Sequence, residues 1–371
     1  MSAEPIYLDW NATTPPHADV LSAMARASQQ AWGNPASTHR LGRRARALVE
    51  DTREKLADLC AVSPRDVLFT SGGTEANNLA LSRAPGLALS RLEHPSVTRV
   101  AEEKSAGGIP VEWVEVTATG CVEPEAYRTA LQRLPRGSVV ALMAANHETG
   151  VLQPLEQVAI LAHELGATLH VDAVQALGKL PAEQWRFADS LALAAHKIRG
   201  PKGIGALAFR GANAPRPVLV GGSQERGLRP GTVDPIAAAG FLAALEHASD
   251  GPRRYLELAP LRDDFEAAFR GVALINGAGA SRLPHVSNLS VTGNSGDEIV
   301  AALDLLGVCI SSGSACSAGT TEASPVITAM LGRERAKAAI RISLGETTTF
   351  DDIRAAKVAL WRVLGPASAS P

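Results

Sequence analysis

The sequence has no excess of either charge. Its 371 residues include 36 Lys and Arg against 38 Asp and Glu, which gives a net charge of −2. The basic residues are scattered among the acidic ones, so the chain lacks the surface expected for binding nucleic acid or anionic lipid. No apolar run approaches the roughly 20 residues that span a bilayer, and residues 1–10 lack the basic and apolar stretches of a signal peptide. We therefore expect a cytoplasmic protein with no direct nucleic-acid partner and no membrane contact.

Cysteines are few and are not arranged in pairs. The four, at positions 60, 121, 309 and 316, form neither a CxxC pair nor a zinc-finger pattern, which favours reduced thiols over disulfides or a resident metal. Cys60 ends a helical pattern, Cys121 follows a turn glycine and Cys309 lies in an apolar run, so these three are expected to be structural. Cys316 differs because only Ser, Gly and Ala surround it over 311–319. Such a segment predicts a mobile loop that carries the thiol.

Short apolar runs alternate with helical patterns between residues 40 and 343. The run 139–144 is apolar at every position, as in parallel strands that helices cover on both faces. With 46% hydrophobic residues, the chain is long enough to build a large core. The predicted fold is α/β, with a doubly wound and mostly parallel sheet. The expected strands are 66–70, 138–145 and 168–171, and the expected helices are 74–82, 155–166 and 235–247.

The alternation breaks at residues 249–252, Ser-Asp-Gly-Pro. We place a domain boundary there, with a large domain over 15–248 and a smaller α+β domain made of 1–14 and 249–371. The helix expected at 296–306 follows Ser295, and Glu298 stands three residues later at the spacing of a capping box. The other elements expected in the smaller domain are strands at 286–291, 308–311 and 340–343, and a helix at 350–364.

Two charged side chains end predicted strands. Lys197 closes an apolar run over 189–197, and Asp172 closes another over 169–172. In open α/β sheets, ligands bind beyond the carboxyl ends of the strands, so both side chains should reach the same edge. A desolvated lysine there can form a Schiff base with an aldehyde cofactor, and a carboxylate can keep a pyridinium nitrogen protonated. The alternatives are a solvated lysine at a strand end and an aspartate that caps a helix.

A glycine-rich turn, residues 70–75 (TSGGTE), joins a predicted strand to a predicted helix. Its backbone N–H groups and hydroxyl can surround a phosphate at the positive end of the helix. The turn lacks the GxxxxGK[ST] pattern, which disfavours nucleotide binding, and a purely steric role is the alternative. Together with Lys197 and Asp172, this turn supplies the third anchor that pyridoxal phosphate requires.

Longer segments extend these motifs in consistent order from about residue 6 to about residue 345. They are YLD from Tyr7, ATTP from Ala12, GNPAS from Gly33, FTSGGTEANNLA from Phe69, HVDAVQALGKLP from His170, AHKIRGPKGIGAL from Ala195, ERGLRPGT from Glu225 and SSGSAC from Ser311. Together they resemble the cysteine desulfurases, pyridoxal phosphate enzymes of the class V aminotransferase superfamily with fold type I. The SSGSAC segment is similar to the long-loop branch, which feeds iron–sulfur cluster assembly and tRNA thiolation.

The resemblance implies a role for each matching residue. The catalytic residues would be the Schiff-base lysine, the sulfur-accepting thiol and a histidine that stacks on the ring and shuttles protons: Lys197, Cys316 and His94. The cofactor's ring nitrogen, ring hydroxyl and phosphate would be held by Asp172, by Gln175, and by Gly73, Thr74 and His196. Thr232 of a neighbouring subunit would complete the phosphate site, which implies a homodimer. Arg341, assisted by Asn34, would clamp the substrate carboxylate.

Two positions depart from the family's pattern. His147, within residues 146–150 (NHETG), stands where a second asparagine near the cofactor's ring oxygen is usual. Ala194 stands where a serine that binds the phosphate is usual. Histidine can still donate a hydrogen bond to the ring oxygen, whereas loss of one hydroxyl removes about 1–2 kcal/mol of phosphate binding. Weaker retention of the cofactor is therefore expected.

The expected reaction converts L-cysteine to L-alanine and leaves a persulfide on Cys316. The loop would then carry this sulfur to an acceptor or iron–sulfur scaffold protein, where Cys316 could contact a transient iron–sulfur cluster. Three alternatives stay open: another fold type I enzyme such as a selenocysteine lyase or an aminotransferase, a weakened subunit that relays sulfur or docks a partner, and a phosphate-binding scaffold. The identity of the acceptor, and the choice between cluster assembly and tRNA thiolation, stay open as well.

Overall fold

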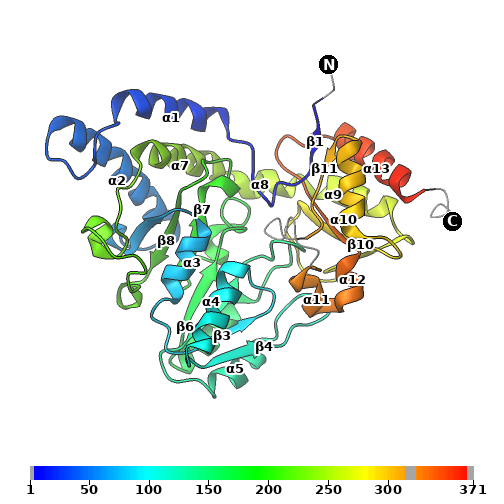
Figure 1. Ribbon diagram of the computed structural model, residues 1–371, viewed down its shortest axis with the longest axis horizontal. Helices are drawn as coiled ribbons and strands as arrows, with labels where there is room; N and C mark the ends of the chain where they lie inside the picture. The colour runs from blue at the N-terminus through cyan, green and yellow to red at the C-terminus, as the bar shows by residue number, and fades with distance from the viewer. Residues whose placement is uncertain (1–3, 314–322, 366–371) are drawn as a thin grey trace.

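A seven-stranded sheet forms the centre of the larger part of the molecule (Figure 1). The computed structural model describes residues 4–313 and 323–365. The strands lie in the order β2-β8-β7-β6-β5-β3-β4, and within this sheet β8 runs antiparallel to both its neighbours while the other pairs are parallel. In chain order they are β2 (Val67–Thr70), β3 (Leu87–Ser90), β4 (Val111–Val114), β5 (Val139–Met143), β6 (Thr168–Asp172), β7 (Ser190–Ala194) and β8 (Gly205–Phe209).

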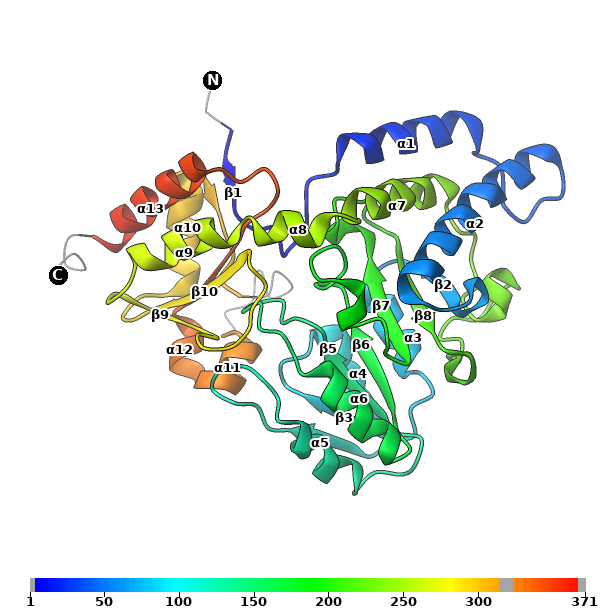
Figure 2. The same ribbon diagram turned by 180° about the vertical axis from the view of Figure 1, so that it is seen from behind.

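Helices cover both faces of this sheet, which confirms the predicted doubly wound arrangement (Figures 1 and 2). On one face lie α3 (Gly73–Leu81) and α4 (Pro95–Ala106). On the other lie α2 (Arg40–Cys60), α5 (Pro124–Leu131) and α6 (Leu155–Glu164), while α7 (Pro235–Ala248) packs against α2 and α1 (Ala18–Gln30). Because of this double cover, β3, β7 and β8 are buried at every position.

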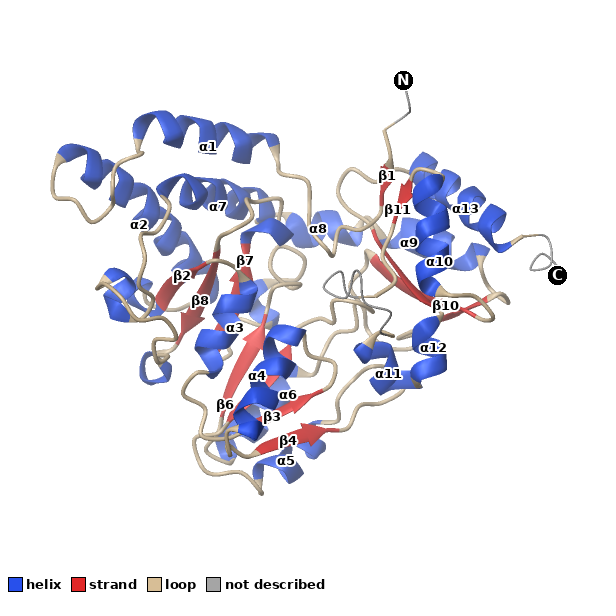
Figure 3. Cartoon of the chain, in the orientation of Figure 1, coloured by secondary structure: helices blue, strands red, loops and turns tan. Residues whose placement is uncertain are grey.

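A second, smaller sheet lies beside the first, as Figure 3 shows. It is antiparallel, in the order β12-β10-β9, and β1 pairs separately with β11. Leu8 joins Phe265 and Ile342 in the hydrophobic cluster of this region, so the N-terminal strand packs with the C-terminal part. The predicted domain boundaries at 14/15 and 248/249 stay a prediction. The elements are β1 (Ile6–Tyr7), α8 (Gly251–Leu256), α9 (Ala259–Ala268), β9 (Ala273–Ile275), β10 (Val286–Val291), α10 (Gly296–Leu305), β11 (Val308–Cys309), α11 (Pro325–Leu331), α12 (Arg333–Lys337), β12 (Ala339–Ser343) and α13 (Phe350–Leu364).

Two local predictions in this region are wrong. Ser295 precedes α10, but its side chain makes no capping hydrogen bond. The strand expected at 308–311 ends at Cys309, since the backbone of Ser311 exchanges two hydrogen bonds with Arg341 on β12. Within residues 4–313 and 323–365, no helix combines the length and apolarity needed to cross a membrane.

Candidate active site

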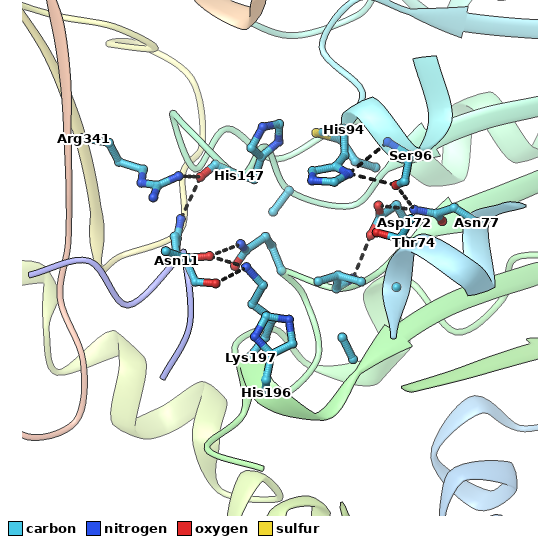
Figure 4. A pocket seen from close by; sticks show the side chains of 17 residues that line it. Asn11, Thr74, Asn77, His94, Ser96, His147, Asp172, His196, Lys197 and Arg341 are labelled. Atoms are coloured by element: carbon cyan, nitrogen blue, oxygen red, sulfur yellow. Dashed lines mark hydrogen bonds between the residues drawn. The ribbon is translucent and has the colours of Figure 1, made fainter. Parts of the chain in front are cut away.

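A cavity of about 200 Å³ opens where β6 and β7 end and α3 begins (Figure 4). Its lining includes ten of the residues predicted from the sequence: Gly73, Thr74, His94, His147, Asp172, Gln175, Ala194, His196, Lys197 and Arg341. Asn11, Asn77 and Ser96 also line it, although the sequence reasoning missed them. The rule that ligands bind beyond the carboxyl ends of parallel strands therefore located the cavity correctly.

Lys197 lies in a 3₁₀ turn, Ala195–Lys197, directly after β7. Its Nζ atom donates hydrogen bonds to the backbone carbonyls of Asn11 and, at 2.8 Å, Ala12. These carbonyls belong to the turn at residues 10–12, between β1 and α1, and both residues line the same cavity. These two hydrogen bonds hold the amine beside the cavity that Lys197 lines.

Asp172, the last residue of β6, is fixed by two donors. Asn77 Nδ2 donates to its Oδ2 at 2.8 Å, and the backbone N–H of Val174 donates to its Oδ1 at 3.0 Å. Asn77 in turn accepts from His170 Nε2 at 2.9 Å. Burial lowers the pKa of His170 to about 4, so this imidazole is neutral near pH 7 and its donor points at Asn77. A carboxylate that these two donors hold in place at the cavity can bind a cationic ring nitrogen.

His94, the N-cap of α4, has a defined tautomer. The backbone N–H of Ser96 donates to its Nδ1 at 3.1 Å, so the proton of the neutral ring resides on Nε2. Ser96 Oγ lies 2.8 Å from the same Nδ1 and accepts from Asn77 Nδ2, also at 2.8 Å. Burial, together with the charge of Lys197, lowers the pKa of His94 although Asp172 opposes the shift. A neutral ring with its Nε2–H directed away from α4 can exchange protons with a bound molecule.

His147 has two buried ring nitrogens with no hydrogen-bond partner among the described residues. Its ring meets that of His94 edge to face, with centroids 5.4 Å apart. Burial, and then the charges of His94, Arg341 and Lys197, hold its pKa well below the usual range. Unpaired nitrogens in such a place cost free energy unless a ligand supplies a partner. His147, which stands where the family usually has asparagine, therefore still brings a hydrogen-bonding side chain to the cavity.

Arg341, on β12, is 1% exposed and lines the cavity from the side of the smaller sheet. Its Nη2 donates to Asp9 Oδ1 at 2.6 Å and its Nη1 donates to the backbone carbonyl of His147 at 3.1 Å. Its Nε has no partner among the described residues. The guanidinium is therefore fixed in place, and its Nε–H is not hydrogen-bonded to any described residue.

The turn before α3 is shaped for an anion. A side chain on Gly73 would come within 2.6 Å of Val174 Cγ2, so only glycine lets the helix begin this close to β6. No side chain caps the first turn of α3, which leaves its N–H groups open for a phosphate. His196 lines the same cavity, where burial and Lys197 lower its pKa to about 4, while Ala194 offers only a methyl group. Together with the unpaired nitrogens of His147, these features fit pyridoxal phosphate.

Three predicted residues are not brought to this cavity. Asn34 is exposed, and its Oδ1 accepts from the N–H of Ala36 within its own loop. Thr232 is exposed as well and lies outside the cavity lining of its own chain. Cys316 lies outside the described residues. Asn77 could have been found from the sequence, because it follows Gly73 by four residues and so shares its helix face, whereas no comparable spacing marks Asn11.

Comparisons with known proteins identify the family of this chain. The family model described as aminotransferase class V matches residues 6–355. A protein of Cereibacter sphaeroides described as a cysteine desulfurase is 40% identical, over 94% of this chain and 93% of its own length. The structure of a NifS-like protein from Rickettsia africae ESF-5 superposes with a TM-score of 0.89 at 29% identity, covering 97% of this chain and 99% of that one. A structure described as SspA in complex with cysteine gives 0.79 at 28% identity, covering 92% and 99%.

Proposed function

This chain belongs to the class V aminotransferase family, and we propose that it is a cysteine desulfurase that uses pyridoxal phosphate. The observation that carries the proposal is the convergence of Lys197, Asp172 and His94 on one cavity, in a chain similar over nearly its whole length to a cysteine desulfurase. The related structure that holds cysteine supports L-cysteine as the substrate.

When bound, pyridoxal phosphate supplies an aldehyde that captures amines and a ring that accepts the electrons of a broken Cα–H bond. Lys197 would hold the aldehyde carbon, and Asp172 would hold the ring nitrogen. His147 and Gln175 would contact the ring oxygen. The phosphate would be held at the start of α3 by Gly73 and Thr74, and by His196. Each of these residues lines the cavity.

The same residues can move the protons that the reaction requires. Lys197 Nζ leaves the carbonyls of Asn11 and Ala12 and takes the Cα proton of the substrate. The Nε2–H of the neutral His94 ring faces away from α4 and can donate a hydrogen bond to a developing amine or thiolate. Arg341 orients the substrate through its carboxylate, using the Nε that has no partner among the described residues.

Sulfur transfer is assigned to Cys316, as the resemblance implies. Its thiolate forms a bond to the sulfur of L-cysteine while the C–S bond of the substrate breaks. The carbon skeleton gains a proton and leaves as L-alanine, and Cys316 keeps the sulfur as a persulfide. A thiol reductant then releases it as sulfide, or an acceptor protein takes it.

The activity is tested by giving the purified holoenzyme L-cysteine and a reductant. We expect sulfide and L-alanine in equal amounts. Release from selenocysteine alone would favour a lyase, and conversion that requires a keto acid would favour an aminotransferase. If no amino acid is consumed although the cofactor is bound, the chain acts as a relay or docking subunit and the proposal fails.

The finer assignments are part of the same proposal. We place the chain in the long-loop branch on its SSGSAC segment, and we propose a cytoplasmic enzyme that delivers sulfur to an iron–sulfur scaffold or to tRNA thiolation. Tryptic mass spectrometry of an acceptor mixed with persulfidated enzyme would identify the recipient. Sulfur that stays on the enzyme with every acceptor tried would contradict a delivery role.

The proposed homodimer predicts that Thr232 acts across the subunit interface. Thr232 is exposed, and so are three apolar side chains earlier in the same segment between β8 and α7: Val218, Leu219 and Val220. Exposed apolar side chains favour burial of this segment by a second copy of the chain. Thr232→Ala should weaken cofactor retention. Co-expression with Lys197→Ala should restore one intact site in each mixed dimer, and with it part of the activity. A monomer in light scattering, or no restoration in mixed dimers, would contradict the interface.

Because Ala194 brings only a methyl group to the cavity, a single substitution to serine is expected to improve retention of the cofactor. Ala194→Ser should add one donor to the phosphate site, and a hydrogen bond worth about 1–1.5 kcal/mol should slow cofactor loss on the order of tenfold. The measurement is the fraction of cofactor retained during dialysis. Ala162→Ser, on α6 and remote from the cavity, serves as the control. Equal retention by the Ala194→Ser variant and the unmodified protein would show that the missing hydroxyl is already compensated.

A further inference from the structure

Lys179 is a buried lysine that the reaction does not use. It is 2% exposed and lies in the turn that follows β6, four residues after Gln175. Its Nζ donates to Gln175 Oε1 at 2.9 Å. Among the described residues it forms no ion pair, although a buried ammonium normally requires a carboxylate partner. Neutralisation by a carboxylate therefore does not explain why this lysine is buried, and the hydrogen bond to Gln175 points to another role.

The surroundings of Lys179 are aromatic or basic. Its Nζ lies 5.9 Å from the centre of the Tyr255 ring on α8, and its charge acts on the buried His285. Burial, and then the charge of Lys197, lowers its pKa to about 7. In both protonation states the amine keeps N–H groups that can donate to Gln175, so the contact survives near neutral pH.

The Gln175 amide can face the cavity in two ways, with its oxygen or with its Nε2–H forward. Lys179 donates, so the amide oxygen must face it. On its other side, Nε2 donates to the backbone carbonyl of Asn11 at 3.1 Å, and a carbonyl can only accept. Both partners require the same orientation, and Asn11 uses one of the two Nε2 hydrogens. The second hydrogen is left for the cavity that Gln175 lines.

We propose that Lys179 is a positioning residue that, together with the backbone carbonyl of Asn11, fixes the direction of the Gln175 amide, so that an N–H donor and not an oxygen faces the ring oxygen of the bound cofactor. This inference rests on the proposed function only in that the cavity binds pyridoxal phosphate. The direction matters because a donor stabilises an anionic oxygen, whereas an amide oxygen in the same place would repel it.

The test is the visible absorption of the holoenzyme as a function of pH. A donor to the ring oxygen favours the deprotonated form of the bound chromophore, so it lowers the pH midpoint of the colour change. Lys179→Met keeps the volume but removes the donor, and should raise this midpoint by about one unit. Lys179→Arg, which still donates, should stay near the unmodified protein. The colour change is read without substrate, so it does not depend on whether the enzyme releases sulfur.

A double-mutant cycle separates orientation from charge or folding. If Lys179 acts through the amide, then Lys179→Met should change nothing further in a Gln175→Met background. An equal shift in both backgrounds, or no shift in the first, would overturn the proposal. Lys202→Met, an exposed lysine near the cavity, controls for loss of a nearby charge and should leave the midpoint unchanged. If Lys179→Met does not fold, Gln175→Glu tests the same point, because it presents only oxygen and should raise the midpoint at least as far; an unchanged midpoint would again overturn the proposal.

Discussion

A Lys197→Ala variant is expected to lose the yellow colour of the bound cofactor and to release sulfide from L-cysteine at least about a thousandfold more slowly. The substitution removes both the amine that holds the cofactor covalently and the base that takes the Cα proton. Lys197 donates hydrogen bonds to the backbone carbonyls of Asn11 and Ala12. In the Lys197→Ala variant, water in the cavity should take the place of the lost amine at these carbonyls. The variant should therefore fold normally.

Absorption spectra and methylene-blue sulfide assays measure the two effects on the same samples. Lys202→Ala is the matched control, because Lys202 is exposed and lies in the glycine-rich turn five residues later. It should keep both colour and activity. Colour that persists after Lys197→Ala would show that another amine captures the aldehyde, and the assignment of the cavity would then be wrong.

A Cys316→Ala variant is expected to keep the cofactor but to lose sulfide release by at least about a hundredfold, since the nucleophile is gone. Its colour change on adding L-cysteine should persist, because substrate capture depends on the cavity and not on this thiol. The two variants thus separate the capture of the amino acid from the removal of its sulfur.

Mass spectrometry of the tryptic peptides supplies the direct readout. After L-cysteine is added without reductant, the peptide that contains Cys316 should gain the mass of one sulfur atom. Cys309→Ala is the matched control, because Cys309 is half-buried on β11 in the same region and should leave both persulfide and sulfide release intact. Undiminished sulfide release from Cys316→Ala would favour a lyase in which this thiol is incidental.

Sequence reasoning found the cavity because strand ends obey a simple geometric rule. Lys197 and Asp172 each terminate an apolar run, and adjacent parallel strands bring such ends together. It missed Asn11, whose backbone carbonyl accepts from both Lys197 and Gln175. A main-chain carbonyl leaves no mark in the residue type, so no pattern could have indicated it. The capping box predicted at Ser295 is absent, because residue spacing alone does not fix the side-chain rotamer that a capping hydrogen bond needs.

Asn34 and Thr232 show a limit of a second kind. Both are identified by motif, yet each lies on the surface of its own chain, outside the lining of the cavity. For Thr232 the resemblance already implies that a neighbouring subunit supplies the residue, which stays a prediction, whereas for Asn34 the resemblance implies no second copy. His147 shows the reverse case: the motif marked it as a departure, and only the structure places its two unpaired nitrogens at the cavity.

The ion pair between Arg341 and Asp9 has a consequence for how long a molecule stays in the cavity. A substrate carboxylate that binds the unpartnered Nε of Arg341 meets a guanidinium whose Nη2 already holds the Asp9 carboxylate at 2.6 Å, so it binds beside an anion and not to an uncompensated cation. The net gain in affinity is smaller than an isolated arginine would provide. L-Alanine carries the same carboxylate as L-cysteine, so we expect the charge of Asp9 to weaken the binding of the product as well as that of the substrate.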